Sequence, residues 1–177
     1  MSEIRALDRL VKVRADFADE VRDGFEHAAQ SCRTCSTPGA CCLDEHFVNV
    51  RISRLEAVAI GTALGKLTPE KQLEVASRTD DAIEKFGLDR EADAATRTFA
   101  CPLFEKGVGC LVHSTAKPLP CIQHACYDRE ADMPPDQLLD NAEAAVDELN
   151  RRTYGSPQPF LSLPTAIKRF WDLARRT

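Results

Sequence analysis

Residues 101–126 read CPLFEKGVGCLVHSTAKPLPCIQHAC and contain four of the eight cysteines of the chain, together with two histidines. The other four cysteines lie upstream in residues 32–42, CRTCSTPGACC, and no cysteine occurs elsewhere. Cysteines that serve only as small core residues would not be confined to two short segments. We interpret these segments as the two halves of one metal-binding centre, held by the helices around them.

The bulk properties of the chain limit its class. With 177 residues it is long enough to build its own core, and we expect a single domain over residues 1–177. The net charge of −5 argues against nucleic acid as a partner, because phosphate binding needs a basic surface. No stretch reaches the roughly 20 apolar residues of a membrane span, and residues 1–30 lack the apolar segment of a signal peptide. We therefore expect a cytoplasmic protein with reduced thiols, no disulfide framework and no membrane partner.

Hydrophobic periodicity predicts a mainly α fold, in which a helical domain surrounds an irregular or small β cysteine-rich core at about residues 32–126. Apolar residues at three- and four-residue intervals predict an N-terminal helix over residues 3–30, and two C-terminal helices are expected within residues 135–176, at about 135–153 and 163–176. The inward face of the first helix is expected to hold Ile4, Leu7, Val11, Ala18, Val21, Phe25 and Ala28, widened by Leu10 and Phe17.

The middle of the chain contains two explicit helix starts. Ser53 with Glu56 fits a capping box. Thr68-Pro69-Glu70 combines a cap, a proline at the first helical position and an acid, and predicts a helix to about Phe86 with Leu73, Ala76, Ile83 and Phe86 on one face. Residues 47–52 alternate like a short strand. Residues 99–104 and 109–113 are expected to pair as a small hairpin, and no regular structure is expected between it and Cys121.

The spacing of the cysteines is typical of metal ligands. A C-x-x-C pair lets two thiolates converge on one ion. Here that pair is followed by two adjacent cysteines and four more, so we predict a metal site. The candidate ligands are Cys32, Cys35, Cys41, Cys42, Cys101, Cys110, Cys121 and Cys126.

The adjacent pair Cys41-Cys42 bears on the number of sites. Consecutive side chains point in different directions in a strand or a helix, so the two do not easily ligate one tetrahedral ion. Eight thiols divide naturally into two sets of four. This favours two close metal sites, or one cluster and one further site.

The identity of the metal stays open between two candidates. All-sulfur coordination suits both zinc and an iron–sulfur cluster. Cys101-Pro102 is similar to the Cys-Pro end of cluster-binding loops, which favours a cluster slightly over zinc. His46, His113 and His124 could each replace a cysteine, although a surface or outer position is favoured while eight thiols are present.

The cysteine pattern as a whole resembles the CxxCxxCC cysteine-cluster family, which is described as zinc- or iron-chelating. The residues that carry the resemblance are C-x-x-C at 32–35, Cys41-Cys42, Cys101-Pro102-Leu103, Gly109-Cys110, Pro118-x-x-Cys121 and Cys126. Residues 36–40 make the first interval longer than is usual in that family. The resemblance implies metal chelation, and it implies little about a reaction.

Three functions are compatible with this pattern. The first is a metal-binding protein whose centre is structural or carries electrons. The second is a metal-dependent protein-modifying or redox enzyme, and the third is a metal carrier or assembly factor. We favour the first, because the sequence shows no Ser/His/Asp constellation, no evident pair of catalytic carboxylates and no phosphate-binding loop.

Overall fold

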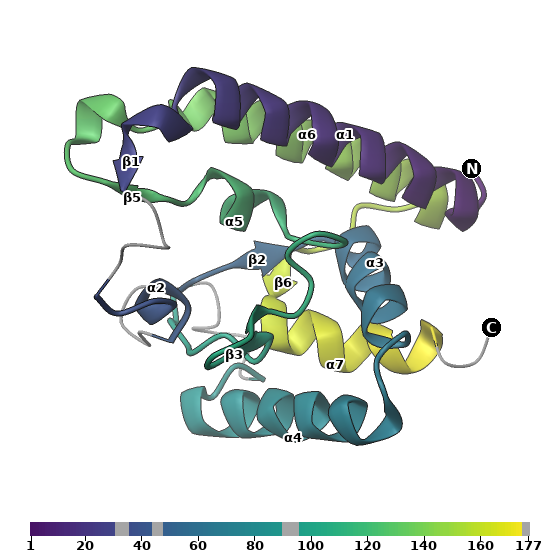
Figure 1. Cartoon of the computed structure of the whole chain (residues 1–177). Helices are drawn as coiled ribbons and strands as arrows, with labels where there is room; N and C mark the ends of the chain where they lie inside the picture. Colours follow the sequence, from purple (N-terminus) through teal and green to yellow (C-terminus); the bar gives the residue numbers. More distant parts are fainter. Residues whose placement is uncertain (31–35, 44–47, 90–95, 175–177) are drawn as a thin grey trace. The chain divides into compact units, whose positions relative to one another are not determined.

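The structure is a computed structural model, and it describes residues 1–30, 36–43, 48–89 and 96–174 (Figure 1). Most of these residues are helical, and the strands are pairs of two residues each, so the expected mainly α class is confirmed. The chain divides into two compact units. Unit 1 comprises Met1–Pro38 and Pro118–Gln158, and unit 2 comprises Gly39–Lys117 and Pro159–Thr177.

Two long antiparallel helices dominate unit 1. They are α1 and α6, which lie side by side in Figure 1. The amino group of Met1 donates a 2.6 Å hydrogen bond to the carbonyl oxygen of Arg152, and the Tyr154 hydroxyl donates to the Glu3 carboxylate at 2.7 Å. The elements of unit 1 are α1 (Glu3–Gly24), the 3₁₀ turn η1 (Glu26–Ala28), β1 (Ala29–Gln30), α5 (Leu119–Gln123), β5 (Cys126–Tyr127), the 3₁₀ turn η2 (Glu130–Asp132) and α6 (Asp136–Tyr154).

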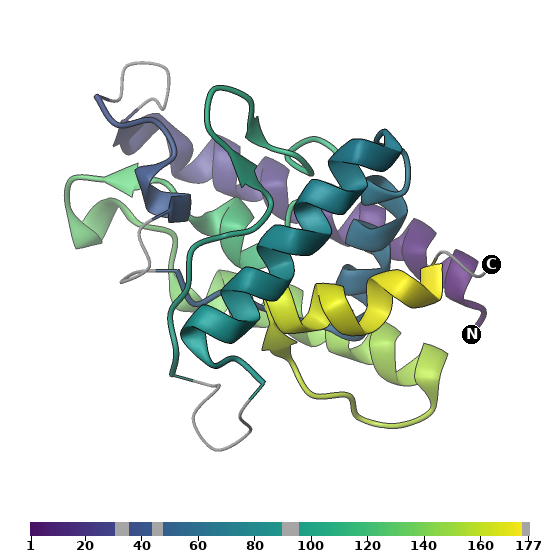
Figure 2. The same cartoon turned by 90° about the horizontal axis from the view of Figure 1, so that it is seen from below.

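Unit 2 is built around α7, which contacts both α3 and α4 (Figure 2). Two small antiparallel pairs, β2 with β6 and β3 with β4, complete it. Its core is apolar and includes Leu55, Ile60, Leu64, Val75, Leu103 and Ile167. The elements of unit 2 are α2 (Ala40–Leu43), β2 (Arg51–Ile52), α3 (Arg54–Leu64), α4 (Pro69–Phe86), β3 (Phe104–Glu105), β4 (Gly109–Cys110), β6 (Leu161–Ser162) and α7 (Leu163–Ala174).

The two helix starts with explicit capping signals are confirmed. The Ser53 hydroxyl accepts from the Glu56 amide, and the Glu56 carboxylate accepts from the Ser53 amide, which is a complete capping box. The Thr68 hydroxyl accepts from the Lys71 amide at the start of α4, and Gly87 ends that helix in the left-handed conformation. A hairpin is present at the predicted place but is shorter than predicted, with Phe104–Glu105 (β3) paired to Gly109–Cys110 (β4).

The first helix is shorter than predicted, and its buried face coincides with the predicted one only in part, at Leu10, Phe17 and Val21. It ends at Gly24, and residues 26–30 form a 3₁₀ turn and a short strand instead. Glycine disfavours helix at this point, and the pairing of β1 with β5 supplies other partners for the backbone. The buried residues are Ala6, Leu10, Phe17 and Val21, whereas Ile4 and Val11 are exposed.

Two further predictions differ from the structure. The inward face of α4 holds Val75, Thr79 and Ala82, while Leu73 is exposed, because the packing against α7 selects a neighbouring stripe of the helix. Regular structure also begins before Cys121. Helix α5 starts at Leu119, since Pro120 fits an N-terminal helical position, where a proline costs no hydrogen bond. Of the strand expected over residues 47–52, only β2 forms among the residues described.

Candidate metal centre

Unit 2 brings four of the predicted ligands together from three separate segments. Cys41 and Cys42 lie on the single helical turn α2, Cys101 lies before β3, and Cys110 lies in β4. The amide of Cys101 donates a 2.8 Å hydrogen bond to the carbonyl oxygen of Cys42, which joins the two cysteine segments directly. Cys110 pairs in the β3–β4 register with Phe104, and Phe104 follows Cys101 by three residues.

The thiol of Cys42 lies near the other three thiols of this group. It is hydrogen-bonded to Cys41, and the proximity of Cys41, Cys101 and Cys110 contributes to the raised pKa of Cys42. Consecutive side chains were expected to point in different directions, and the thiols of Cys41 and Cys42 are nevertheless hydrogen-bonded to each other. We call Cys41, Cys42, Cys101 and Cys110 the four-thiol group.

Backbone amides point at two of these sulfurs. The amides of Leu103 and Phe104, two and three residues further along, lie near the Cys101 sulfur and lower its pKa, and the Phe104 amide also donates to the carbonyl oxygen of Cys101 at 3.3 Å. The Cys110 sulfur accepts from the amide of Val112, again two residues along. A donor aimed at sulfur stabilises the thiolate more than the thiol, and metal-bound cysteines are thiolates. The two turns are therefore built to accept negative charge on sulfur.

Burial opposes that charge. It is the largest cause of the raised pKa values, which reach about 12 for Cys42 and about 11 for Cys101. It also raises the pKa of Cys110, against the amide of Val112 and the charge of Lys117. These thiols are protonated near neutral pH in the protein alone. A cation bound among them would supply the positive charge that converts them to thiolates.

Unit 1 carries the remaining candidates. Cys121 lies in α5, and Cys126 lies in β5, where it pairs with Gln30 of β1. Cys32 follows Gln30 by two residues in the sequence. Cys32 and Cys35 lie outside the described residues.

The predicted histidine alternatives are at the surface where they are described. His113 and His124 are both exposed, and His46 lies outside the described residues. The amide of His113 donates to the carbonyl oxygen of Cys110 and so closes the turn that follows this cysteine. An exposed imidazole next to a thiol group agrees with the surface or outer position favoured from the sequence.

The thiols are neighbours without forming a finished coordination site. In the described part of the chain, no three histidine, cysteine, aspartate or glutamate side chains stand in an arrangement that could hold a metal ion. The donor chemistry of the four-thiol group nevertheless fits zinc or an iron–sulfur cluster, since both take four thiolates. Binding would require the cysteine side chains to rotate toward a common point.

Sequence reasoning missed the cations beside the thiols. Arg78 of α4 lies near Cys101, and Lys117 lies near Cys110, and each charge lowers the pKa of its neighbouring thiol against the effect of burial. Nothing in the local sequence pointed to Arg78, because an arginine within a polar helix surface is ordinary. Lys117 was visible only as a basic residue near the cysteines.

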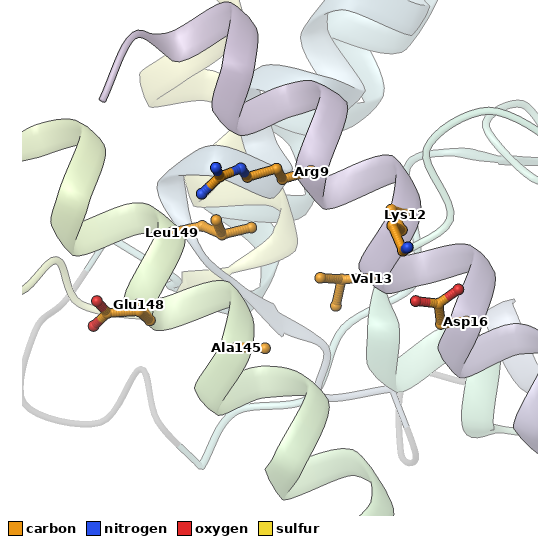
Figure 3. Close-up of a pocket in the computed structure, with 7 residues that line it drawn as sticks. All are labelled: Arg9, Lys12, Val13, Asp16, Ala145, Glu148 and Leu149. Atoms are coloured by element: carbon orange, nitrogen blue, oxygen red, sulfur yellow. The ribbon is translucent and has the colours of Figure 1, made fainter.

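A hollow of about 330 Å³ between α1 and α6 in unit 1 was a second candidate for an active site (Figure 3). It is lined by apolar and charged residues, namely Arg9, Lys12, Val13, Asp16, Ala145, Glu148 and Leu149. Its carboxylate Glu148 pairs with Arg151 and Arg152, which keeps its pKa below the usual range. An ionised, paired carboxylate is a poor general acid, and the hollow contains no thiol or imidazole.

No family model, no curated protein and no solved structure matches this chain. The resemblance to the CxxCxxCC family therefore stays a prediction. Among the helices that the structure describes, none is long and apolar enough to cross a membrane. The functional argument consequently starts from the four-thiol group.

Proposed function

We propose that the protein binds a metal centre, an iron–sulfur cluster or zinc, through its cysteine thiolates, and that this centre is structural or carries electrons. The observation that supports the proposal is the proximity of Cys41, Cys42, Cys101 and Cys110 in unit 2, where the other three thiols each raise the pKa of Cys42 and nearby backbone amides lower the pKa of Cys101 and Cys110. A neutral buried thiol gains little from such donors. A thiolate bound to a metal gains more, because hydrogen bonds to sulfur stabilise and tune metal centres.

The described cysteines fall in both units. Unit 2 contains the four-thiol group, and the described segments of unit 1 contain Cys121 and Cys126. This division supports the two-site alternative over one eight-thiolate centre. Under this proposal, each unit holds its own four-ligand site, and the adjacent cysteines Cys41 and Cys42 serve the same one.

The enzyme and carrier alternatives have less support. The hollow beside Glu148 lacks the groups of a catalytic site, and no pair of acid and base is apparent near the thiols in the described residues. The four thiols of unit 2 are only partly exposed, and the Cys101 sulfur is fixed by two amides. Such a buried, hydrogen-bonded environment favours a retained centre over an ion that is passed on. A cytoplasmic location, where thiols stay reduced, belongs to the same proposal.

Elemental analysis and an absorption spectrum of the full chain, purified without air, test this proposal. Iron with acid-labile sulfide and broad visible absorption that dithionite bleaches would support an electron-carrying cluster. Colourless protein with about two zinc ions per chain would support two structural four-thiolate sites. Protein that contains neither metal, and takes up neither after reduction and anaerobic reconstitution, would overturn the proposal.

A chelator experiment distinguishes a retained centre from a carrier. A structural zinc is lost only as the fold melts, because its binding free energy is part of the folding free energy. A carrier would release the ion to a competing chelator under native conditions. Rapid release from folded protein would move the carrier function to first place.

A further inference from the structure

Arg78 is half-buried, and most of its hydrogen-bonding capacity is unused. Its Nη1 donates a 3.2 Å hydrogen bond to the carbonyl oxygen of Phe104. Its Nε and Nη2 are buried and have no hydrogen-bond partner in the part of the chain that the structure describes. A guanidinium buried in this way is costly, because its desolvation is not repaid by hydrogen bonds.

The nearby carboxylates do not compensate Arg78. Glu74, one helical turn earlier, forms an ion pair with Lys71 at 2.7 Å. Glu105 also pairs with Lys71, with both carboxylate oxygens at 3.0 Å from the ammonium nitrogen. Lys71 therefore bridges both acids. The charge of Arg78 lowers the pKa of Glu74, yet no hydrogen bond between these two side chains is present among the described contacts.

The other neighbour of Arg78 is the four-thiol group. Arg78 and Cys101 both form hydrogen bonds with Phe104. The carbonyl oxygen of Phe104 accepts from Arg78 at 3.2 Å, while its amide donates to the carbonyl oxygen of Cys101 at 3.3 Å. One residue thus links the arginine to the backbone of Cys101.

Charge arithmetic shows what a loaded site would need. A divalent ion with four thiolates carries a net charge of about −2. A partly buried dianion requires nearby positive charge and hydrogen-bond donors. Arg78, together with Lys117 beside Cys110, provides two positive charges at the edge of the group. The planar fork of arginine can donate to one or two sulfurs, which an ammonium group does less well.

We propose that Arg78 is a positioning residue of the thiolate centre, and that its buried Nε–H and Nη2–H groups donate to the sulfurs of the loaded site and compensate its negative charge. This inference rests on the proposed metal-binding function. It explains why an arginine with two buried donors that lack a partner donates no hydrogen bond to a carboxylate among the described residues. In the loaded protein these donors would face the centre.

The test compares the full-length wild type with Arg78→Met, Arg78→Lys and the matched control Arg97→Met. Arg97 is also half-buried and donates through Nη1 to a backbone carbonyl, that of Phe86 at 2.9 Å. Each protein is reduced, stripped of metal and titrated anaerobically with Co²⁺, and Zn²⁺ then displaces the cobalt. The readouts are the dissociation constant, the energy of the sulfur-to-cobalt charge-transfer band, and the melting temperature with and without metal.

We expect Arg78→Met to weaken binding of the metal by about 10- to 100-fold, as for other residues that support metal ligands. The charge-transfer band should shift, because thiolates that lose a hydrogen bond are easier to oxidise. Arg78→Lys should recover part of the affinity by restoring the charge. Arg97→Met should bind the metal like the wild type. Without metal, Arg78→Met should melt at the wild-type temperature or higher, since it removes an unpaired buried cation, and only the loaded variant should be less stable.

The outcomes separate the two proposals. A wild type that binds neither Co²⁺ nor Zn²⁺ nor an iron–sulfur cluster overturns the proposed function and this inference with it. A wild type that binds metal, with an Arg78→Met variant of equal affinity and an unshifted band, overturns the inference alone. If Arg78→Met does not fold, the Arg78→Lys variant provides the test. A metal affinity and a charge-transfer band equal to those of the wild type in this variant would count against the role of the guanidinium donors. For an iron–sulfur cluster, the midpoint potential replaces the cobalt band and should become more negative in Arg78→Met.

Discussion

Gly39 lies directly against the aromatic ring of Phe104: a Cβ built on Gly39 would stand 1.8 Å from the Phe104 Cζ atom. Gly39 also has a φ of +82°, which favours glycine. Its carbonyl oxygen accepts from the amides of Cys42 and Leu43 and so begins the helical turn α2. This glycine therefore sets the approach of the adjacent cysteines to the segment that carries Cys101.

Gly39→Ala is expected to destabilise the protein and to weaken metal binding. The left-handed backbone alone costs about 1–2 kcal/mol for a residue with a Cβ. The methyl group would also displace the Phe104 ring, and with it the turn whose amides face the Cys101 sulfur. Urea denaturation and metal titration of the variant measure the two effects.

Gly107→Ala is the matched control for this substitution. Gly107 has the same φ of +82°, but a Cβ built there meets no atom within 4 Å. It should show only the backbone cost and retain its affinity for metal. Equal losses of stability and affinity in the two variants would show that the contact with Phe104 does not matter.

Cys101→Ser and Cys121→Ser should each lower metal content and thermal stability together, because metal binding contributes to the folding free energy. The two substitutions test the two units separately, since Cys101 belongs to unit 2 and Cys121 to unit 1. Metal analysis and thermal unfolding should show about half of the zinc lost in each variant if every unit holds one site.

The same variants in excess chelator provide the control. Without metal, serine replaces a thiol of nearly the same size, so the stability difference from the wild type should shrink to about 1 kcal/mol or less. Full metal content in either variant would remove that cysteine from the set of ligands. Loss of all metal in both variants would favour one shared centre over two sites.

Local signals in the sequence predicted the elements that carry them. The capping box at Ser53 and the cap at Thr68 define helix starts through side-chain hydrogen bonds within three residues, and both starts are confirmed. The inward faces of α1 and α4 were predicted less well. Amphipathic periodicity shows that a face exists, but the partner helix decides which stripe is buried. On α4 that partner is α7, which begins nearly a hundred residues later.

The site shows the same division between local and distant information. Residue type and spacing predict the cysteines as ligands, and four of them lie near one another in unit 2. The contact of Gly39 with the Phe104 ring, next to Cys41 and Cys42, was not predictable, because it joins segments more than sixty residues apart. Arg78 was missed for a similar reason. Its proposed role depends on a hydrogen bond to Phe104, 26 residues away, and on the missing hydrogen-bond partners of its Nε and Nη2 in the described part of the chain.

The capping box at Ser53 should be worth more than the cap at Thr68. Ser53 is fully buried and exchanges hydrogen bonds with Glu56, a carboxylate that is only 4% exposed. Ser53→Ala should cost about 1–2 kcal/mol through the lost cap, with a further loss from the weakened pairing of Glu56. Thr68→Ala removes one long, exposed hydrogen bond of 3.4 Å and should cost about 0.5 kcal/mol. Urea denaturation of both variants measures the difference, and an equal or larger loss in Thr68→Ala would contradict it.

The stability of the metal-free protein should fall as pH rises above about 9. In the unfolded chain a cysteine loses its proton near its ordinary pKa of 9.0, whereas folding raises the pKa of Cys42 to about 12 and that of Cys101 to about 11. Between these values the folded protein holds protons that the unfolded chain has released, so raising the pH favours unfolding. The contribution of these thiols is complete below pH 9 and is lost as pH rises through 11 to 12.

Urea denaturation from pH 8 to pH 10.5, in reductant and excess chelator, measures this dependence. The double variant Cys42→Ala/Cys101→Ala should show a flatter profile, because it lacks the two protonated thiols. The stability of metal-loaded wild-type protein should also depend less on pH, because metal binding has already displaced the protons from its thiolates. A metal-free wild type whose stability does not change with pH over this range would mean that burial in unit 2 does not hold these thiols in the protonated form.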